Sequence, residues 1–314
     1  MGATSGVGFE ATAQLAEAGY TRVTITGRSL ERAEQARADL EARTGRDVFA
    51  TLALELNSPE SVWAAGVELV RRGDQIDFLL LNAGVLSGGE LIRTEEGIEG
   101  TVAPMIGHHR LTMRLLEAGP LSEDTRIVTS GSEAARGDVP IMNSIEPPKL
   151  AAEHFANDPI AAVAIQRFDP PLQYSPTTAY SMAKVLVAYW TATLARRLPA
   201  EMTVNAVSPG NALTTSAPRN AGFMMRRIML PLMKILPGMS DTVTVATKRY
   251  LDAAQFADDQ SGDFYASPPK KMISWMEKVV VPHVLDEAGQ EAAWETIDLV
   301  ASANIEAVKP AGAL

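Results

Sequence analysis

The chain contains no cysteine, and histidine occurs only four times among its 314 residues. The lack of thiols excludes disulfide bonds and thiolate metal sites. The histidines are His108, His109, His154 and His283, and no two stand four residues apart, the spacing at which one helix presents a pair of metal ligands. The sequence therefore predicts no metal site.

Positive charge is also scarce. Lysine and arginine number 28 against 38 acidic residues, which gives a net charge of −10. A surface of this sign repels phosphate backbones, so nucleic acid is not an expected partner. No charged-then-apolar leader and no apolar run of membrane-spanning length occurs, and we expect a cytoplasmic protein.

What the sequence does contain is an alternation of strand and helix patterns. Near-continuous apolar or β-branched runs predict strands over 21–27, 47–56, 75–84, 125–131, 202–210 and 262–267, and helical patterns cover 29–43 and 177–198. This order predicts an α/β fold, with a doubly wound, mostly parallel sheet and helices on both faces of a single domain.

Two regions depart from the alternation. Residues 134–176 carry seven prolines, which disfavour both an internal helix and a central strand, so we interpret them as an insertion. Residues 268–314 form a C-terminal appendage with one amphipathic helix over 287–301. The main domain is therefore assigned to residues 1–267.

Three glycines stand among the first eight residues. Gly2, Gly6 and Gly8 have the spacing of a tight turn that leads directly into a helix. A helix beginning at Gly6 would direct free backbone N–H groups at an anion, and glycine allows a pyrophosphate to approach closely. A turn with a purely structural role is the alternative.

A tyrosine and a lysine stand four residues apart in a predicted helix. Tyr180 and Lys184 therefore project from one face, after a strand that leads to Ser130 and Ser132. By itself, this pair is also compatible with a simple surface contact.

These stretches occur in the order of one known family. They are GATSGVG (2–8), LNAG (81–84), IVTSGS ending at Ser132, YSMAK (180–184) and SPGNALT (208–214). On these motifs the sequence resembles the short-chain dehydrogenase/reductase family from Gly2 to about Ser267. The resemblance implies a Rossmann-like domain that binds a nicotinamide dinucleotide.

The resemblance implies catalytic roles for three side chains. Tyr180 would be the general acid/base toward a carbonyl or alcohol, and Ser132 would polarise the carbonyl oxygen. Lys184 would hold the ribose hydroxyls. Its charge, at about 4 Å, would also lower the pKa of the phenol by up to about 3.

Cofactor-binding residues follow from the same resemblance. They are the turn residues Gly2, Thr4, Ser5, Gly6, Val7 and Gly8, then Arg28 and Ser29, Glu55 and Leu56, Asn82, Ala83 and Gly84, and Pro209, Gly210 and Thr214, beside Tyr180 and Lys184. Glu55 replaces the usual aspartate near the adenine, with a solvated side chain as the alternative. Asn82 is expected to stabilise the sheet rather than touch substrate.

The residue at the end of the second family strand indicates which cofactor is used. An acid there would bind the ribose 2′-hydroxyl of NAD, whereas a base accommodates the 2′-phosphate of NADP. The residue is Arg28, followed by Ser29, so NADP is favoured over NAD. A solvated arginine beside NAD is the alternative.

Three departures from the family pattern stand out. No strand precedes Gly2, where the family has its central strand, and we expect the true start to lie upstream of Met1. The family asparagine is absent from the helix that contains Pro104, and a proline inside it would kink the helix and put the proton relay in doubt. Ser132 and Tyr180 are 48 residues apart, a long interval that favours a monomer or homodimer.

The substrate side is assigned to residues 211–240, where the family builds a lid. Five methionines within 223–239 provide an adaptable apolar surface, which suits a lipophilic small molecule. Core packing and contact with a membrane surface are the less favoured interpretations. The preferred function is an NADP-dependent oxidoreductase acting on a carbonyl or secondary alcohol. The alternatives are a cofactor-binding protein with little or no turnover and a peripheral membrane protein.

Overall fold

The computed structural model describes residues 1–84, 91–139, 176–210 and 242–303. Its strands are β1 (Val23–Gly27), β2 (Phe49–Ala53), β3 (Ile76–Leu81), β4 (Leu121–Ser130), β5 (Thr203–Val207), β6 (Phe264–Ala266) and β7 (Glu277–Lys278). Its helices are α1 (Gly6–Glu17), α2 (Leu30–Thr44), α3 (Pro59–Arg72), α4 (Ala103–Ala118), the short 3₁₀ helix η1 (Glu133–Arg136), α7 (Pro176–Ala195), α9 (Val243–Ala253) and α10 (Glu287–Ala303).

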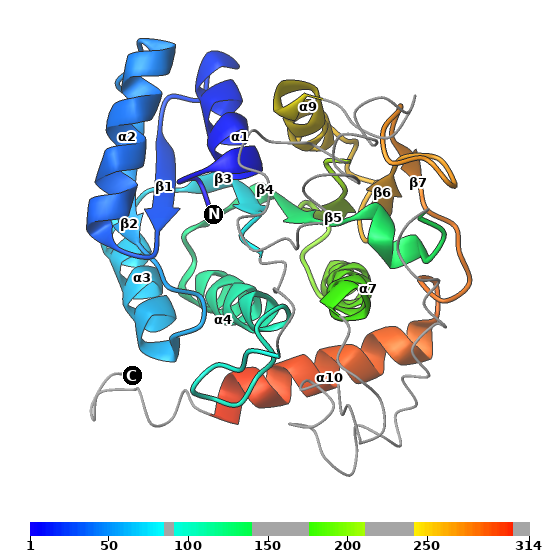
Figure 1. Cartoon of the computed structure of the whole chain (residues 1–314). Coiled ribbons are helices and arrows are strands. Elements are labelled where there is room, and N and C mark those ends of the chain that lie inside the picture. Colours follow the sequence, from blue (N-terminus) through cyan, green and yellow to red (C-terminus); the bar gives the residue numbers. More distant parts are fainter. Residues whose placement is uncertain (85–90, 140–175, 211–241, 304–314) are drawn as a thin grey trace.

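The strands form two hydrogen-bonded groups. β1 pairs with β2, and a second group has the order β3-β4-β5-β6-β7. Every pair is parallel except β6 with β7. The predicted α/β fold with a mostly parallel sheet is confirmed, and the six predicted strands are β1 to β6 (Figure 1).

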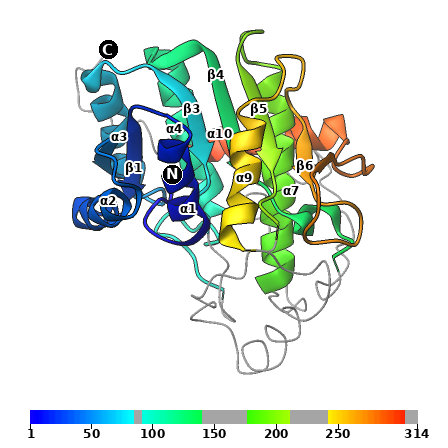
Figure 2. The ribbon, with the colours of Figure 1, turned by 90° about the horizontal axis from the view of Figure 1, so that it is seen from above.

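Helices cover both faces of the sheet. α1 and α9 lie side by side on one face, while α4 and α7 lie on the other (Figures 1 and 2). α10 crosses beneath α4 and α7 and packs against both. The helices thus place the buried strands β3, β4 and β5 at the centre of the main hydrophobic core.

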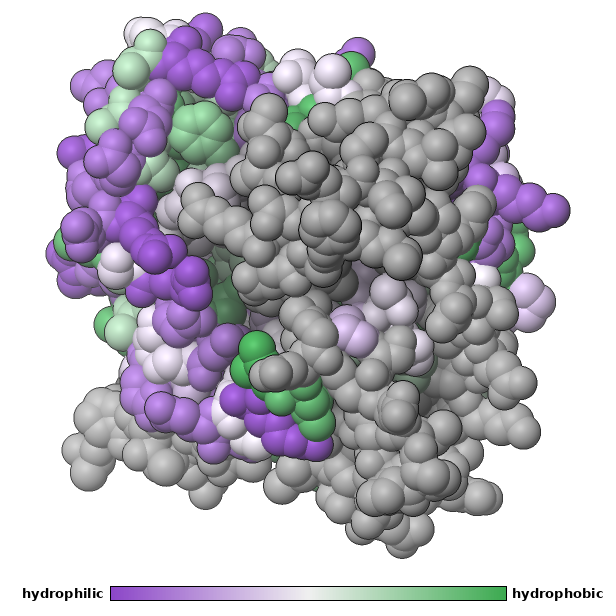
Figure 3. Space-filling view, in the orientation of Figure 1, coloured by the Kyte–Doolittle hydropathy of each residue, from purple (hydrophilic) through white to green (hydrophobic). Residues whose placement is uncertain are grey.

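Local signals explain where the outer helices begin and end. Ser29 caps the N-terminus of α2 by accepting a hydrogen bond from the backbone N–H of Arg32, and Gly45 ends the helix in the left-handed conformation. α2 buries only Ala33, Ala36 and Leu40, and most of its other residues are charged or polar. The space-filling view shows this hydrophilic surface over α2 (Figure 3).

Aromatic side chains join α10 to α4 and α7. Trp294 of α10 stacks on Trp190 of α7 with ring centroids 6.2 Å apart. His109 of α4 accepts a hydrogen bond from the Trp190 indole at 3.0 Å, and its other ring nitrogen meets the carboxylate of Asp298 at 3.1 Å. His109 is therefore part of the packing between α4, α7 and α10.

The predicted kink at Pro104 is wrong. α4 begins at Ala103, so the proline occupies its first turn, where no intrahelical N–H bond is lost. His108, one turn further on, is 5% exposed, and among the described residues its Nε2 has no hydrogen-bond partner.

A gap separates β1 from β3. The two strands are not paired, and a cavity of about 170 Å³ lies between them, lined by residues of both. The amino group of Met1 lies at this gap and donates to the backbone oxygen of Leu80 at 2.6 Å. The gap therefore occupies the place at which the sequence predicts a missing strand.

Some predictions fall on residues that the structure does not describe. The lid (211–240), Thr214 and His154 lie outside the described residues, as does most of the predicted insertion. Among the helices within the described ranges, none has the length and apolar character needed to cross a membrane.

Candidate active site

The opening turn has the geometry of an anion site. α1 begins at Gly6 as predicted, and Gly2 and Gly6 have φ angles of +73° and +59°. A side chain is disfavoured at such angles. Gly8 lies so close to the turn that an added Cβ would be 2.1 Å from the backbone oxygen of Gly2. The turn therefore leaves the N–H groups at the start of α1 open to a ligand.

Gly8→Ala is expected to force this turn open. The added methyl group has no space, so we expect a loss of about 1–3 kcal/mol in the free energy of unfolding. Affinity for a dinucleotide should fall at least about tenfold, because the turn would no longer fit the pyrophosphate. Thermal denaturation and cofactor titration measure the two effects.

Gly100→Ala is the matched control, since its added Cβ would approach no atom closer than 3.4 Å. Equal behaviour of the two variants in both measurements would contradict the assignment.

Asn82 and Ala83 hold the turn from the end of β3. Asn82 Nδ2 donates to the backbone oxygen of Met1 at 3.2 Å. The Cα of Ala83 lies 3.0 Å from the point where a Cβ on Gly2 would stand. Gly84 follows them at the surface, and a Cβ on Gly84 would stand 3.9 Å from Lys184 Nζ. β3 thereby connects the turn to the predicted catalytic residues.

Arg28 lies beside the same turn. It is exposed at the end of β1, directly before Ser29, the N-cap of α2. An added Cβ on Gly27 would come within 3.1 Å of the Thr4 side chain, which places the β1–α2 connection against the turn. The guanidinium is therefore available to a phosphate bound nearby.

Glu55 and Leu56 follow β2 and differ in environment. The Glu55 carboxylate accepts a hydrogen bond from the backbone N–H of Asn57 at 3.2 Å. Leu56 is buried, and its backbone oxygen lies 2.3 Å from the position of a Cβ on Gly107. Gly107 thus allows α4 to pack closely on the loop after β2.

The three predicted catalytic side chains come together where β4 and α7 meet. The hydroxyl of Ser132, at the N-cap of η1, hydrogen-bonds the phenol of Tyr180. Lys184 Nζ donates to the backbone oxygen of Ser130 at 2.6 Å and lies 5.6 Å from the Tyr180 ring centroid. Both Tyr180 and Lys184 line a small pocket that also contains His108.

The expected acidification of Tyr180 is not found. Burial is the largest effect and raises the pKa of the phenol, the hydrogen bond with Ser132 lowers it, and the negative charge of Glu133 raises it further. Burial also lowers the pKa of Lys184 to about 8. The prediction was wrong because it counted the attraction of the ammonium for the phenolate and neglected desolvation of both groups.

Buried polar residues around this pocket were not predicted. Tyr250 of α9 hydrogen-bonds Ser130 Oγ at 2.8 Å and Asn82 Oδ1 at 3.4 Å, which joins the ends of β3 and β4. Burial lowers the pKa of His108 to about 3, so its imidazole is neutral near pH 7. No local sequence pattern indicates either role, because the partners are far apart along the chain.

The loop after β5 carries Pro209 and Gly210. Gly210 has a φ of +79°, and its N–H donates to Ser208 Oγ at 3.1 Å. A Cβ at this glycine would stand 2.8 Å from the backbone oxygen of Met272. The loop is therefore held tightly by the segment after β6, at the edge of the site.

Comparison with known proteins finds dehydrogenases and oxidoreductases. A family model described as short chain dehydrogenase matches residues 1–159, which is half of the chain. The WW domain-containing oxidoreductase of Drosophila melanogaster is 29% identical over 241 residues, covering 75% of this chain and 54% of that protein. Human retinol dehydrogenase 13 is 27% identical over 215 residues, covering 68% and 58%. The chain thus spans little more than half the length of these curated relatives.

A solved structure shows the same fold. A short chain dehydrogenase from Burkholderia cenocepacia, crystallised in complex with NADP, superposes with a TM-score of 0.56 and 23% identity. The alignment covers 84% of this chain and 92% of that one.

Proposed function

The chain belongs to the short-chain dehydrogenase family, and we propose that it is an NADP-dependent oxidoreductase that interconverts a carbonyl compound and a secondary alcohol. The observation that carries the proposal is the placement of Ser132 beside the Tyr180 phenol, and of Tyr180 and Lys184 together in the lining of one pocket. The glycine turn before α1 fits the dinucleotide, because a Cβ at Gly8 would close it.

Each polar side chain has a distinct task in this reaction. When bound, the nicotinamide supplies or accepts the hydride. The Tyr180 hydroxyl gives its proton to the carbonyl oxygen as negative charge develops there, and takes a proton in the reverse direction. Ser132 polarises the same oxygen through its hydroxyl, and Lys184 holds the ribose and carries a positive charge at pH values below about 8.

Arg28 supports the choice of NADP. A guanidinium can bind the 2′-phosphate through two hydrogen bonds, and Arg28 is exposed and directly follows Gly27, which packs against Thr4 of the glycine turn. The NADP complex of the Burkholderia relative is compatible with this choice.

Arg28→Asp is expected to shift the cofactor preference from NADPH toward NADH. Loss of the charge-assisted contact should weaken NADPH binding by about 10–100-fold, equivalent to about 1.4–2.7 kcal/mol, while NADH binding is unchanged or improves. Fluorescence titration of both cofactors measures the ratio.

Arg46→Asp, beyond the far end of α2, is the matched control for net charge. A parallel loss of NADPH affinity in both variants would show that only long-range charge is involved.

We propose a lipophilic substrate, from the methionine-rich residues 223–239, which lie outside the described residues. We further propose a cytoplasmic monomer or homodimer. Contact with a membrane surface is the less favoured alternative.

The experiment that tests the function is NADPH oxidation with a panel of aromatic and aliphatic ketones. Turnover of lipophilic ketones is the expected result. Binding of NADPH without oxidation by any ketone would instead favour a cofactor-binding protein with little or no turnover.

A further inference from the structure

An acidic residue directly follows Ser132 and is almost completely buried. Glu133 is the first residue of η1 and is only 2% exposed. One carboxylate oxygen accepts a hydrogen bond from the Ser208 hydroxyl. The other accepts from the backbone N–H and hydroxyl of Ser267 at 3.1 and 2.8 Å. Because both oxygens of this buried carboxylate accept hydrogen bonds, the position of the Glu133 side chain is closely defined.

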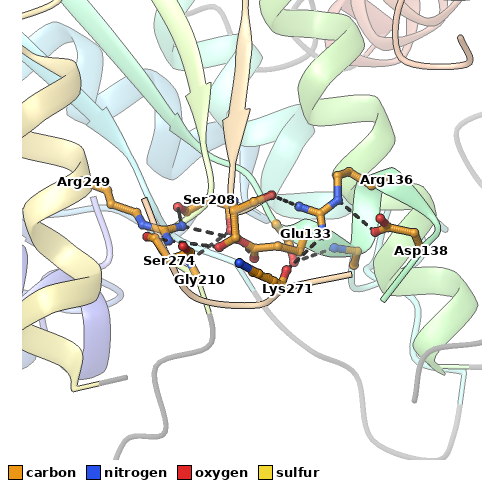
Figure 4. Close-up of polar contacts among 11 residues, drawn as sticks. Glu133, Arg136, Asp138, Ser208, Gly210, Arg249, Lys271 and Ser274 are labelled. Atoms are coloured by element: carbon orange, nitrogen blue, oxygen red, sulfur yellow. Dashed lines mark hydrogen bonds and ion pairs between the residues drawn. The ribbon is translucent and has the colours of Figure 1, made fainter. Parts of the chain in front are cut away.

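Arg249 of α9 completes this cluster. It is 8% exposed, and its guanidinium lies 3.3 Å from the Glu133 carboxylate. The same guanidinium donates to the backbone oxygens of Ser208 at 3.0 Å and Ser274 at 2.6 Å, and to Ser267 Oγ at 3.0 Å. The pair thus joins η1, the end of β5, the end of β6 and the segment that follows it (Figure 4).

The far end of η1 is anchored in a similar way. Arg136 donates to the backbone oxygens of Ser267 and Lys271 and to the Asp138 carboxylate (Figure 4). The short helix that begins after Ser132 is therefore attached at both ends to the segment after β6.

The cluster also reaches the loop that carries Gly210. The N–H of Gly210 donates to Ser208, and a Cβ at Gly210 would stand 3.3 Å from the Arg249 guanidinium. The loop and Ser132 therefore depend on the same ion pair, although they lie more than 70 residues apart in the sequence.

Stability alone does not explain a buried ion pair. The free-energy cost of removing two charges from water is nearly as large as the stabilisation from their attraction. A well-packed pair of apolar side chains at the same place is therefore often as stable. What such a pair provides is a defined geometry. This suggests that the cluster serves the site that it borders.

We propose that Glu133 and Arg249 are positioning residues, which hold the Ser132 hydroxyl and the Pro209–Gly210 loop in one fixed relation on the two sides of the candidate active site. The proposal rests on the proposed function, because the relation matters for a substrate oxygen at Ser132 and a nicotinamide beside the loop. Neither side chain itself is placed in contact with the reacting atoms.

Glu133→Gln tests the proposal with little change in shape. It leaves Arg249 without its counter-ion and should shift both attached segments. A misplacement of about 1 Å costs on the order of 100-fold in rate, so we expect kcat to fall by about 10–100-fold. We expect the Kd for NADPH to rise by about 5–10-fold, because the Gly210 loop is released.

The pH profile supplies a readout that a merely structural role would not change. Tyr180 is faced by Lys184 on its own helix, Glu133 on η1, Tyr250 on α9 and His108 on α4. Loss of the negative charge at Glu133 lowers the pKa of a neighbouring acid. The alkaline limb of kcat should therefore move to lower pH in Glu133→Gln.

Glu10→Gln is the matched control. Glu10 is also a largely buried carboxylate, paired with Arg43 at 2.6 Å between α1 and α2. Its loss should lower the melting temperature while kcat and the pH profile stay unchanged. If Glu133→Gln behaves in the same way, the positioning role is overturned.

A second variant covers the case in which Glu133→Gln does not fold. Ser267→Ala removes one hydroxyl donor and leaves the ion pair intact, so a smaller change in the same direction is expected. A folded Ser267→Ala protein with unchanged NADPH affinity and kcat would overturn the proposal. NADPH binding also separates the proposed function from the positioning role. A wild-type protein that binds NADPH but reduces no ketone would refute the proposed function. The Kd of Glu133→Gln for NADPH would still decide the positioning role.

Discussion

Replacing Tyr180 with phenylalanine is expected to lower kcat for carbonyl reduction by about 10²–10⁴-fold. The variant lacks the proton that Tyr180 would give to the substrate oxygen, while the ring that packs beside Lys184 is retained. NADPH affinity should change by less than about threefold, because the glycine turn and Arg28 are untouched. Single-turnover oxidation of NADPH and a fluorescence titration measure the two quantities.

Tyr189→Phe is the control for this substitution. Tyr189 lies on the same helix, is 1% exposed, and its hydroxyl donates to the backbone oxygen of His283. We expect that variant to lose some stability, since a buried acceptor loses its donor, and to keep its rate. A rate that survives in Tyr180→Phe would show that the proton comes from another group.

The environment of Tyr180 makes this experiment informative. Burial and the nearby Glu133 raise the pKa of its phenol, so it is a protonated donor at neutral pH. This state suits reduction, in which the phenol begins with its proton. Oxidation of an alcohol requires the phenolate and should be favoured at higher pH. The two directions of the reaction are therefore expected to have opposite pH dependence.

The sequence predicted the elements and the residues whose signals are local. Apolar runs located β1 to β6, the glycine spacing located the start of α1, and the four-residue interval placed Tyr180 and Lys184 on one face. Each of these signals is contained within a few neighbouring residues. Their positions in the family motifs then indicated the chemistry, which the comparisons support at the level of the family.

Long-range contacts could not be predicted in this way. Glu133 and Arg249 are 116 residues apart, and nothing in either segment indicates a partner. The shift in the Tyr180 pKa depends on how much of the phenol is buried, which no spacing reveals. The effect of Pro104 was predicted wrongly because it depends on where α4 begins. A proline in the first turn of a helix is tolerated, whereas a proline a few residues further on would kink it.

The gap between β1 and β3 leads to the second large expected effect. An extension of about five valine and isoleucine residues before Met1 should enter this gap as a strand, because residues 76–80 of β3 line it. It would run parallel to β3, since Met1 already bonds Leu80 near the end of that strand. Filling about 170 Å³ is worth about 4 kcal/mol, or about 5–10 °C in melting temperature.

Two effects contribute to that gain, filling of the gap and removal of the buried Met1 ammonium, and only the second depends on pH. Burial lowers the pKa of the Met1 ammonium to about 5 from 8. The folded state therefore disfavours the charged form, and this cost is absent above pH 8 and grows as the pH falls toward 5. An extended chain has an amide nitrogen there, which does not titrate, so its advantage in melting temperature should increase from pH 8 to pH 5. A glycine-serine extension of the same length also removes the ammonium but cannot fill the gap, and an equal gain from both extensions at pH 8 would contradict strand insertion.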